Sequence, residues 1–118
     1  MKKYKQLFNE VTAKGNCYEA NGKYFMDNSW TDHTLTLVHG IVTGQGKLLG
    51  VRYGHCWVED GSNVIDKANG NNVNIPKKLY YSLGKINEEE CYKYNFSEFG
   101  KWVNKVGHWG PWELESEL

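Results

Sequence analysis

The chain lacks the features that mark several large classes of protein. Its 14 basic and 14 acidic residues give a formal net charge of zero, so no overall electrostatic attraction draws it to nucleic acid or to an anionic membrane. No apolar run approaches the roughly 20 residues needed to cross a bilayer. We therefore expect neither a nucleic-acid partner nor a membrane partner.

Cysteine is also scarce. The three cysteines, Cys17, Cys56 and Cys91, are odd in number and form no CxxC pair, which argues against a disulfide framework and against a structural zinc knuckle. Residues 1–8 lack the apolar segment, about 7–15 residues long, of a signal peptide. We expect a reducing, cytoplasmic environment in which a free thiol persists.

The 118 residues fit a single domain, 1–118, that mixes helical and strand patterns. The periodicity and the turn residues predict an α+β fold. In chain order, the first predicted elements are a short helix within 1–14, a helix over about 17–26, and strands over 34–43, 48–59 and 63–67. A Gly/Asn-rich loop over 68–74 and a helix over 76–83, stopped by Gly84, follow. The last predicted elements are a weak strand over 90–94 and a helix that an Asn95–Glu98 capping box opens and Gly107 ends. The tryptophans after Gly107 are expected to pack back onto the domain.

The most informative stretch is a hairpin around Asp60-Gly61, a pair that favours a two-residue turn between two apolar-rich runs. In that register His55 lies directly opposite Asp66, with both side chains on one face and about 4.5–5.5 Å between their Cβ atoms. A carboxylate beside an imidazole makes a poised general base. The sequence therefore predicts a base and its orienter on neighbouring strands.

The nucleophile that such a base would serve is Cys17. Gly15-Asn16 interrupts the chain just before it, and Asn is a preferred N-cap, so Cys17 is predicted to open a helix. A helix N-terminus favours the thiolate form, and its free N–H groups can hold an oxyanion. Candidate catalytic residues are Cys17, His55 and Asp66, and candidates for an oxyanion hole or substrate pocket are Asn16, His39 and Trp57.

These residues also have simpler interpretations. Cys17 could be a structural core cysteine, as we expect for Cys56 and Cys91, and His55 and Asp66 could be ordinary sheet residues. His39 lies on a strand face otherwise made of leucine and isoleucine, where it is either a core residue or a competitor for the role of base. By ligand type, Cys17, His39, His55 and Asp66 could also bind zinc, but no spacing favours this. We expect no metal and no cofactor.

The ordered set Cys17, Gly54-His55-Cys56-Trp57-Val58-Glu59 and Val64-Ile65-Asp66 resembles the papain-like cysteine enzymes, closest to their transglutaminase-like and NlpC/P60-like branches. In those families a cysteine opens a helix, a histidine opens an "HAW-E" type strand, and a polar residue follows on the next strand. The resemblance covers residues 15–67. It departs from the pattern at Cys56, where alanine is common, and in lacking a clear upstream glutamine for an oxyanion hole.

The resemblance implies Cys17 as nucleophile, His55 as general base and acid, and Asp66 as orienter. It implies a papain-like core in which a helix carrying Cys17 packs on a small antiparallel sheet. The expected activity is that of a cysteine hydrolase or acyltransferase, acting on an amide, isopeptide or ester bond of a protein, a peptide or a small amide. Hydrolysis would make it a peptidase, amidase or deamidase.

Two alternatives stay open: transglutaminase-type transfer to an amine, and a non-catalytic binding protein that keeps the fold. Compact members of this kind resemble bacteriophage proteins, which would place the chain in the host cytoplasm.

Overall fold

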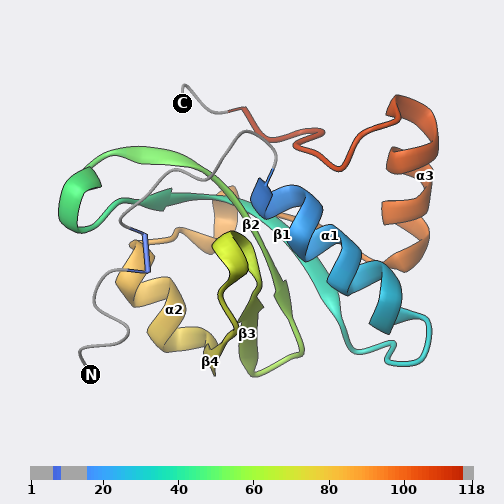
Figure 1. Cartoon of the computed structure of the whole chain (residues 1–118), viewed down its shortest axis with the longest axis horizontal. Helices are drawn as coiled ribbons and strands as arrows, with labels where there is room; N and C mark the ends of the chain where they lie inside the picture. The colour runs from blue at the N-terminus through green and yellow to red at the C-terminus, as the bar shows by residue number, and fades with distance from the viewer. Residues whose placement is uncertain (1–6, 9–15, 116–118) are drawn as a thin grey trace.

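A five-stranded antiparallel sheet with strand order β4-β3-β2-β1-β5 forms the centre of the molecule (Figure 1). The structure, a computed structural model, describes residues 7–8 and 16–115. The strands are β1 (Thr36–Thr43), β2 (Arg52–Glu59), β3 (Asn63–Asp66), β4 (Val73–Pro76) and β5 (Tyr92–Tyr94), and the α-helices of the described residues are α1 (Asn16–Ser29), α2 (Lys77–Gly84) and α3 (Phe96–Val106). This architecture confirms the predicted α+β class. The helix expected within 1–14 falls largely outside the described residues.

The sheet separates two hydrophobic clusters. One face carries Leu37, Cys56 and Val58 against α1, and the other carries Val38 and Trp57 against α2. Figure 1 shows α1 and α2 on opposite sides of the central strands. Because side chains alternate along a strand, neighbouring residues of β2 belong to different clusters. This alternation decides which side chains can meet at the candidate site.

The hairpin between β2 and β3 turns one residue later than predicted. The Asp60 N–H donates to the Asn63 carbonyl (3.1 Å), so Gly61 and Ser62 form the two-residue loop, not Asp60 and Gly61. Gly61 adopts a φ of 104°, and the Asp60 carboxylate accepts a hydrogen bond from the Asn63 N–H (2.8 Å). A glycine with positive φ fits the first central position of such a turn, which explains the shift.

The shifted turn changes the predicted register without moving side chains to the other face. Val58 pairs with Ile65 and Glu59 with Val64, so His55 and Asp66 are diagonal neighbours and the prediction that they lie directly opposite is wrong. Since the register moves by two residues, the side-chain parity is retained. His55 and Asp66 therefore still share a face.

Other element boundaries follow the sequence with local differences. β2 begins at Arg52 and not at Leu48, because residues 46–48 form a 3₁₀ turn. The segment 68–74, predicted as a loop, contains the start of β4, which is fixed by its pairing with β3. Lys85, and not Gly84, takes the left-handed position after α2. Gly84 is instead needed for packing, since a Cβ there would lie 3.0 Å from the Phe8 ring.

The C-terminal part follows its prediction closely. Asn95 and Glu98 form the capping box of α3, and Gly107 ends the helix with a φ of 76°. Trp109 and Trp112 pack back against the cluster under α1. In the part of the chain that the structure describes, no helix has the length and apolar character required to span a membrane.

Candidate active site

Cys17 lies in the first turn of α1 and is only 3% exposed. Asn16, predicted as the N-cap, is itself the first residue of the helix. Its side-chain oxygen accepts a hydrogen bond from the Asn69 backbone N–H (3.0 Å), which ties the start of α1 to the segment after β3. The prediction that Cys17 lies at a helix N-terminus is thus confirmed, although Cys17 is the second residue of the helix and not the first.

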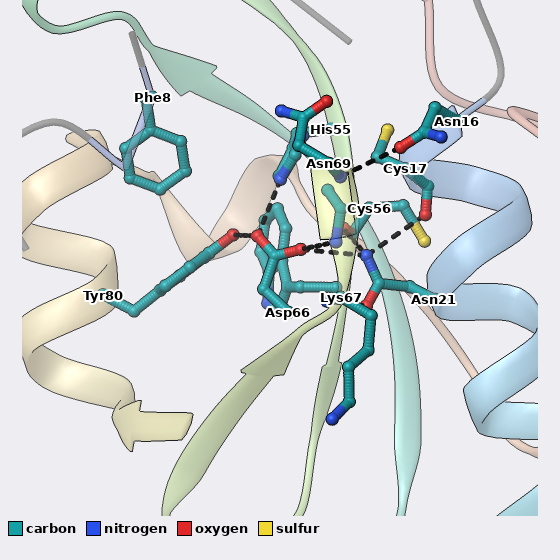
Figure 2. A network of polar contacts seen from close by, with 12 residues as sticks. Phe8, Asn16, Cys17, Asn21, His55, Cys56, Asp66, Lys67, Asn69 and Tyr80 are labelled. Carbon is teal, nitrogen blue, oxygen red and sulfur yellow. Dashed lines mark hydrogen bonds and ion pairs between the residues drawn. The ribbon is translucent and has the colours of Figure 1, made fainter. Parts of the chain in front are cut away.

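The predicted base and orienter are in direct contact. His55 Nε2 lies 2.9 Å from Asp66 Oδ2, and the two residues are 5% and 7% exposed. The contact runs diagonally between β2 and β3 (Figure 2). Because Nε2 faces the carboxylate, the other ring nitrogen, Nδ1, is the atom of His55 left to exchange a proton with a reacting group.

The Asp66 carboxylate is saturated with hydrogen-bond donors. Oδ2 accepts from the Tyr80 hydroxyl (2.7 Å) as well as from His55, and Oδ1 accepts from the Ala68 N–H (2.9 Å) and from Asn21 Nδ2 (3.0 Å) (Figure 2). Burial by itself would raise the pKa of Asp66, but the charge of His55 and the hydrogen bonds from His55, Ala68 and Asn21 lower it to about 2. Asp66 is therefore a fixed negative charge that holds the imidazole in place.

His55 is correspondingly held in its charged form. Burial by itself would lower the pKa of His55, but the charges of Asp66 and of the Cys17 sulfur raise it to about 10. His55 Nδ1 itself is buried and makes no hydrogen bond of ordinary geometry in the described residues. Catalytic hydrogen bonds are often long before substrate binds. The structure thus joins the imidazole directly to the carboxylate, and the Cys17 sulfur acts on the same ring through its charge.

Sequence reasoning missed two residues of this site. Tyr80 comes from α2 on the far side of the sheet, and nothing in the sequence links it to Asp66. Asn21 is fully buried, and its position four residues after Cys17, on the apolar stripe of the helix, was a usable signal.

His39 lies on the other face of the sheet. It pairs with Cys56, whereas Gly40 pairs with His55, so the two imidazoles point in opposite directions. The His39 ring is enclosed by Tyr18, Tyr94 and Trp112, with ring centroids 4.9–5.0 Å away. The zinc alternative, which needed His39 and His55 in one ligand set, is therefore wrong. Among residues 7–8 and 16–115, no group of three or more histidine, cysteine or acidic side chains is placed to hold a metal ion.

Trp57 and the other two cysteines have positions typical of packing residues. Trp57 is fully buried, donates from Nε1 to Glu59 Oε2 (3.0 Å) and stacks beside the His55 ring. Cys56 is fully buried on the α1 face, as expected, and burial raises the pKa of its thiol. Cys91, also expected in the core, is only partly buried, and burial raises the pKa of its thiol to about 11.

Comparison of the chain with protein families, with characterised proteins and with solved structures finds no match. Evidence for function therefore comes from the geometry of the chain itself. That geometry supplies a thiol at a helix start, an imidazole with one nitrogen committed to a carboxylate, and a second nitrogen oriented away from that carboxylate.

Proposed function

We propose that the protein is a cysteine hydrolase or acyltransferase with a papain-like arrangement, in which Cys17 is the nucleophile, His55 the general base and acid, and Asp66 the orienter. The observation that carries the proposal is the 2.9 Å contact between His55 Nε2 and Asp66 Oδ2, and the Cys17 sulfur supports it because it helps to raise the pKa of that imidazole. Such a thiol, base and orienter set is the signature of nucleophilic catalysis. Candidate substrates are the amide, isopeptide or ester bonds of a protein, a peptide or a small amide.

In the proposed reaction the Cys17 thiolate attacks the substrate carbonyl carbon, and the carbonyl electron pair moves to oxygen. Free N–H groups of the first turn of α1 are suited to hold that oxyanion. As the intermediate collapses, His55 Nδ1 gives its proton to the leaving amine or alcohol, leaving a thioester on Cys17. His55 Nδ1 then takes a proton from water or from an acceptor amine, which attacks the thioester carbonyl. The C–S bond breaks, the acyl group leaves as an acid or an amide, and the Cys17 thiolate and protonated His55 are restored.

Alkylation by iodoacetamide, followed by peptide mass mapping, tests the proposal without knowledge of the substrate. The probe is small, which suits a thiol that is only 3% exposed. We expect Cys17 to be labelled near neutral pH much faster than Cys56 or Cys91, and expect His55→Ala to slow that labelling. Slow labelling of all three thiols at similar rates would contradict the proposal and favour a binding protein that keeps the fold.

Activity on a simple activated ester then separates the two forms of the reaction. Release of the free acid indicates hydrolysis, and formation of a hydroxamate when hydroxylamine is added indicates transfer to an amine. Cys17→Ala should abolish both products while circular dichroism shows the domain still folded. If Cys17→Ala retains turnover, the ester is being cleaved elsewhere and the assignment of Cys17 fails.

A further inference from the structure

The β2–β3 ladder is interrupted beside the candidate site. Its pairs are Val58 with Ile65 and Glu59 with Val64. If the same register continued for two more residues, Cys56 would lie opposite Lys67. Hydrogen-bonded and non-hydrogen-bonded pairs alternate along an antiparallel ladder, so the backbone groups of Cys56 and Lys67 would exchange hydrogen bonds. The structure has no such backbone bond among its described residues at this position.

The side chain of Asn21 occupies the place of that missing bond. Asn21 Nδ2 donates to the Cys56 carbonyl (2.9 Å), and Asn21 Oδ1 accepts from the Lys67 N–H (2.8 Å) (Figure 2). A carboxamide carries the same donor and acceptor pair as a peptide group. The inserted amide therefore satisfies both strands while holding them apart.

The same amide nitrogen also reaches two residues of the proposed catalytic set. It donates to the Cys17 backbone carbonyl (3.1 Å) and to Asp66 Oδ1 (3.0 Å). Asn21 thus links the helix that carries the nucleophile, both strands of the hairpin and the orienting carboxylate. At 0% exposure, the Asn21 amide is shielded from bulk water.

This insertion resolves a geometric difficulty. Cys17 belongs to the cluster on the α1 face, whereas His55 alternates with Cys56 and points to the α2 face. A continuous sheet would separate them. We propose that Asn21 is a positioning residue whose amide replaces one rung of the β2–β3 ladder, opening the sheet so that the Cys17 thiol on one face meets His55 on the other. The catalytic role of the contact between Cys17 and His55 rests on the proposed function, but the insertion of the Asn21 amide into the ladder does not.

The test compares Asn21→Ala with Asn28→Ala. Asn28 is a matched control because its Nδ2 donates to the Tyr24 carbonyl four residues earlier (2.8 Å), the same bond within the helix that Asn21 makes to Cys17. We expect Asn21→Ala to speed hydrogen exchange at the Lys67 amide about tenfold, to lower the pKa of His55 measured by nitrogen NMR, and to slow the alkylation of Cys17. If Asn21→Ala and Asn28→Ala give the same three results, the proposal is overturned.

If Asn21→Ala does not fold, Asn21→Asp tests the same proposal. Aspartate keeps the acceptor for the Lys67 N–H but sets a second carboxylate against Asp66, so Lys67 protection should persist while the pKa of Asp66, followed by carbon NMR, rises. An Asp66 titration unchanged in Asn21→Asp would also overturn the proposal. These NMR results need no enzyme activity, so they are distinct from failure of the proposed function, which would show as slow alkylation of Cys17 in the unmodified protein.

Discussion

Two histidines on neighbouring strands, His39 and His55, are both buried but differ in their hydrogen-bond partners and in their pKa. His55 is bonded to Asp66, while both ring nitrogens of His39 lack hydrogen-bond partners in the described part of the chain. Burial lowers the pKa of His39 to about 3; burial would also lower the pKa of His55, but Asp66 and Cys17 raise it to about 10. The comparison shows that the partner, not the depth of burial, decides whether an imidazole in this core is charged.

The two histidines should therefore shape the pH dependence of stability in opposite ways. His55 stabilises the fold fully below its unfolded pKa of about 6.5, and that contribution is lost as pH rises towards 10. His39 is neutral in the fold, so as pH falls from 6.5 towards 3 the unfolded chain binds a proton that the folded chain does not. Asp66 adds a further loss only below about pH 4, because its pKa is lowered to about 2.

Removal of the partner of His55 should have the largest effect. Asp66→Asn leaves a buried imidazole without its counter-charge, and we expect the free energy of unfolding to fall by roughly 3–5 kcal/mol at neutral pH. The pKa of His55 should then drop, as burial is no longer opposed by the carboxylate. Urea unfolding and nitrogen NMR measure the two changes.

Asp32→Asn is the matched control for this change, since Asp32 is exposed and its side chain, among the described residues, accepts hydrogen bonds from Thr34 of the same loop. It should leave both the unfolding free energy and His55 essentially unaltered. Equal behaviour of the two variants would show that His55 does not depend on Asp66.

The next largest effect should come from replacing the unpartnered histidine. His39→Phe has similar volume and removes no hydrogen bond of the described residues, so little stability should be lost at pH 7. In acid the variant should be more stable than the unmodified protein, by roughly 2–4 kcal/mol near pH 3. The reason is that its unfolded state no longer gains stability by binding a proton at position 39. Denaturant unfolding between pH 7 and 3 checks this, and parallel curves for the two proteins would contradict a neutral His39.

A smaller effect is expected from the tyrosine that donates to Asp66. Tyr80→Phe removes only the hydroxyl that donates to Asp66 Oδ2, a bond to a charged group that contributes about 1.5–3 kcal/mol. The pKa of Asp66 should rise, since one hydrogen bond to its charged form is lost. If neither the unfolding free energy nor the carbon NMR titration of Asp66 changes, the carboxylate is held without Tyr80.

Local signals were enough to predict some of this structure. The Asn95–Glu98 capping box is contained in four residues, and it forms as expected. Period-two alternation put His55 and Asp66 on one face even though the turn was placed one residue early, because parity survives a register shift of two. The helix with Cys17 near its start was likewise predictable from the break at Gly15-Asn16.

What escaped prediction depends on tertiary contacts. β4 has no strand signal of its own in a Gly/Asn-rich segment and exists through pairing with β3. Asn21 and Tyr80 meet Asp66 from two helices on opposite faces of the sheet. No local sequence pattern indicates that these two side chains contact Asp66, so they could not be predicted as its hydrogen-bond donors without the structure.

The central claim is that Cys17, His55 and Asp66 act as one unit, and nitrogen NMR of the His55 ring in the unmodified protein and in Cys17→Ala tests it most directly. The account predicts a His55 that stays protonated well above pH 7 in the unmodified protein. It also predicts a lower pKa of His55 in Cys17→Ala, because the sulfur contributes part of the rise. A His55 that titrates identically in the two proteins, or that is already neutral at pH 7 as His39 is expected to be, would contradict the account.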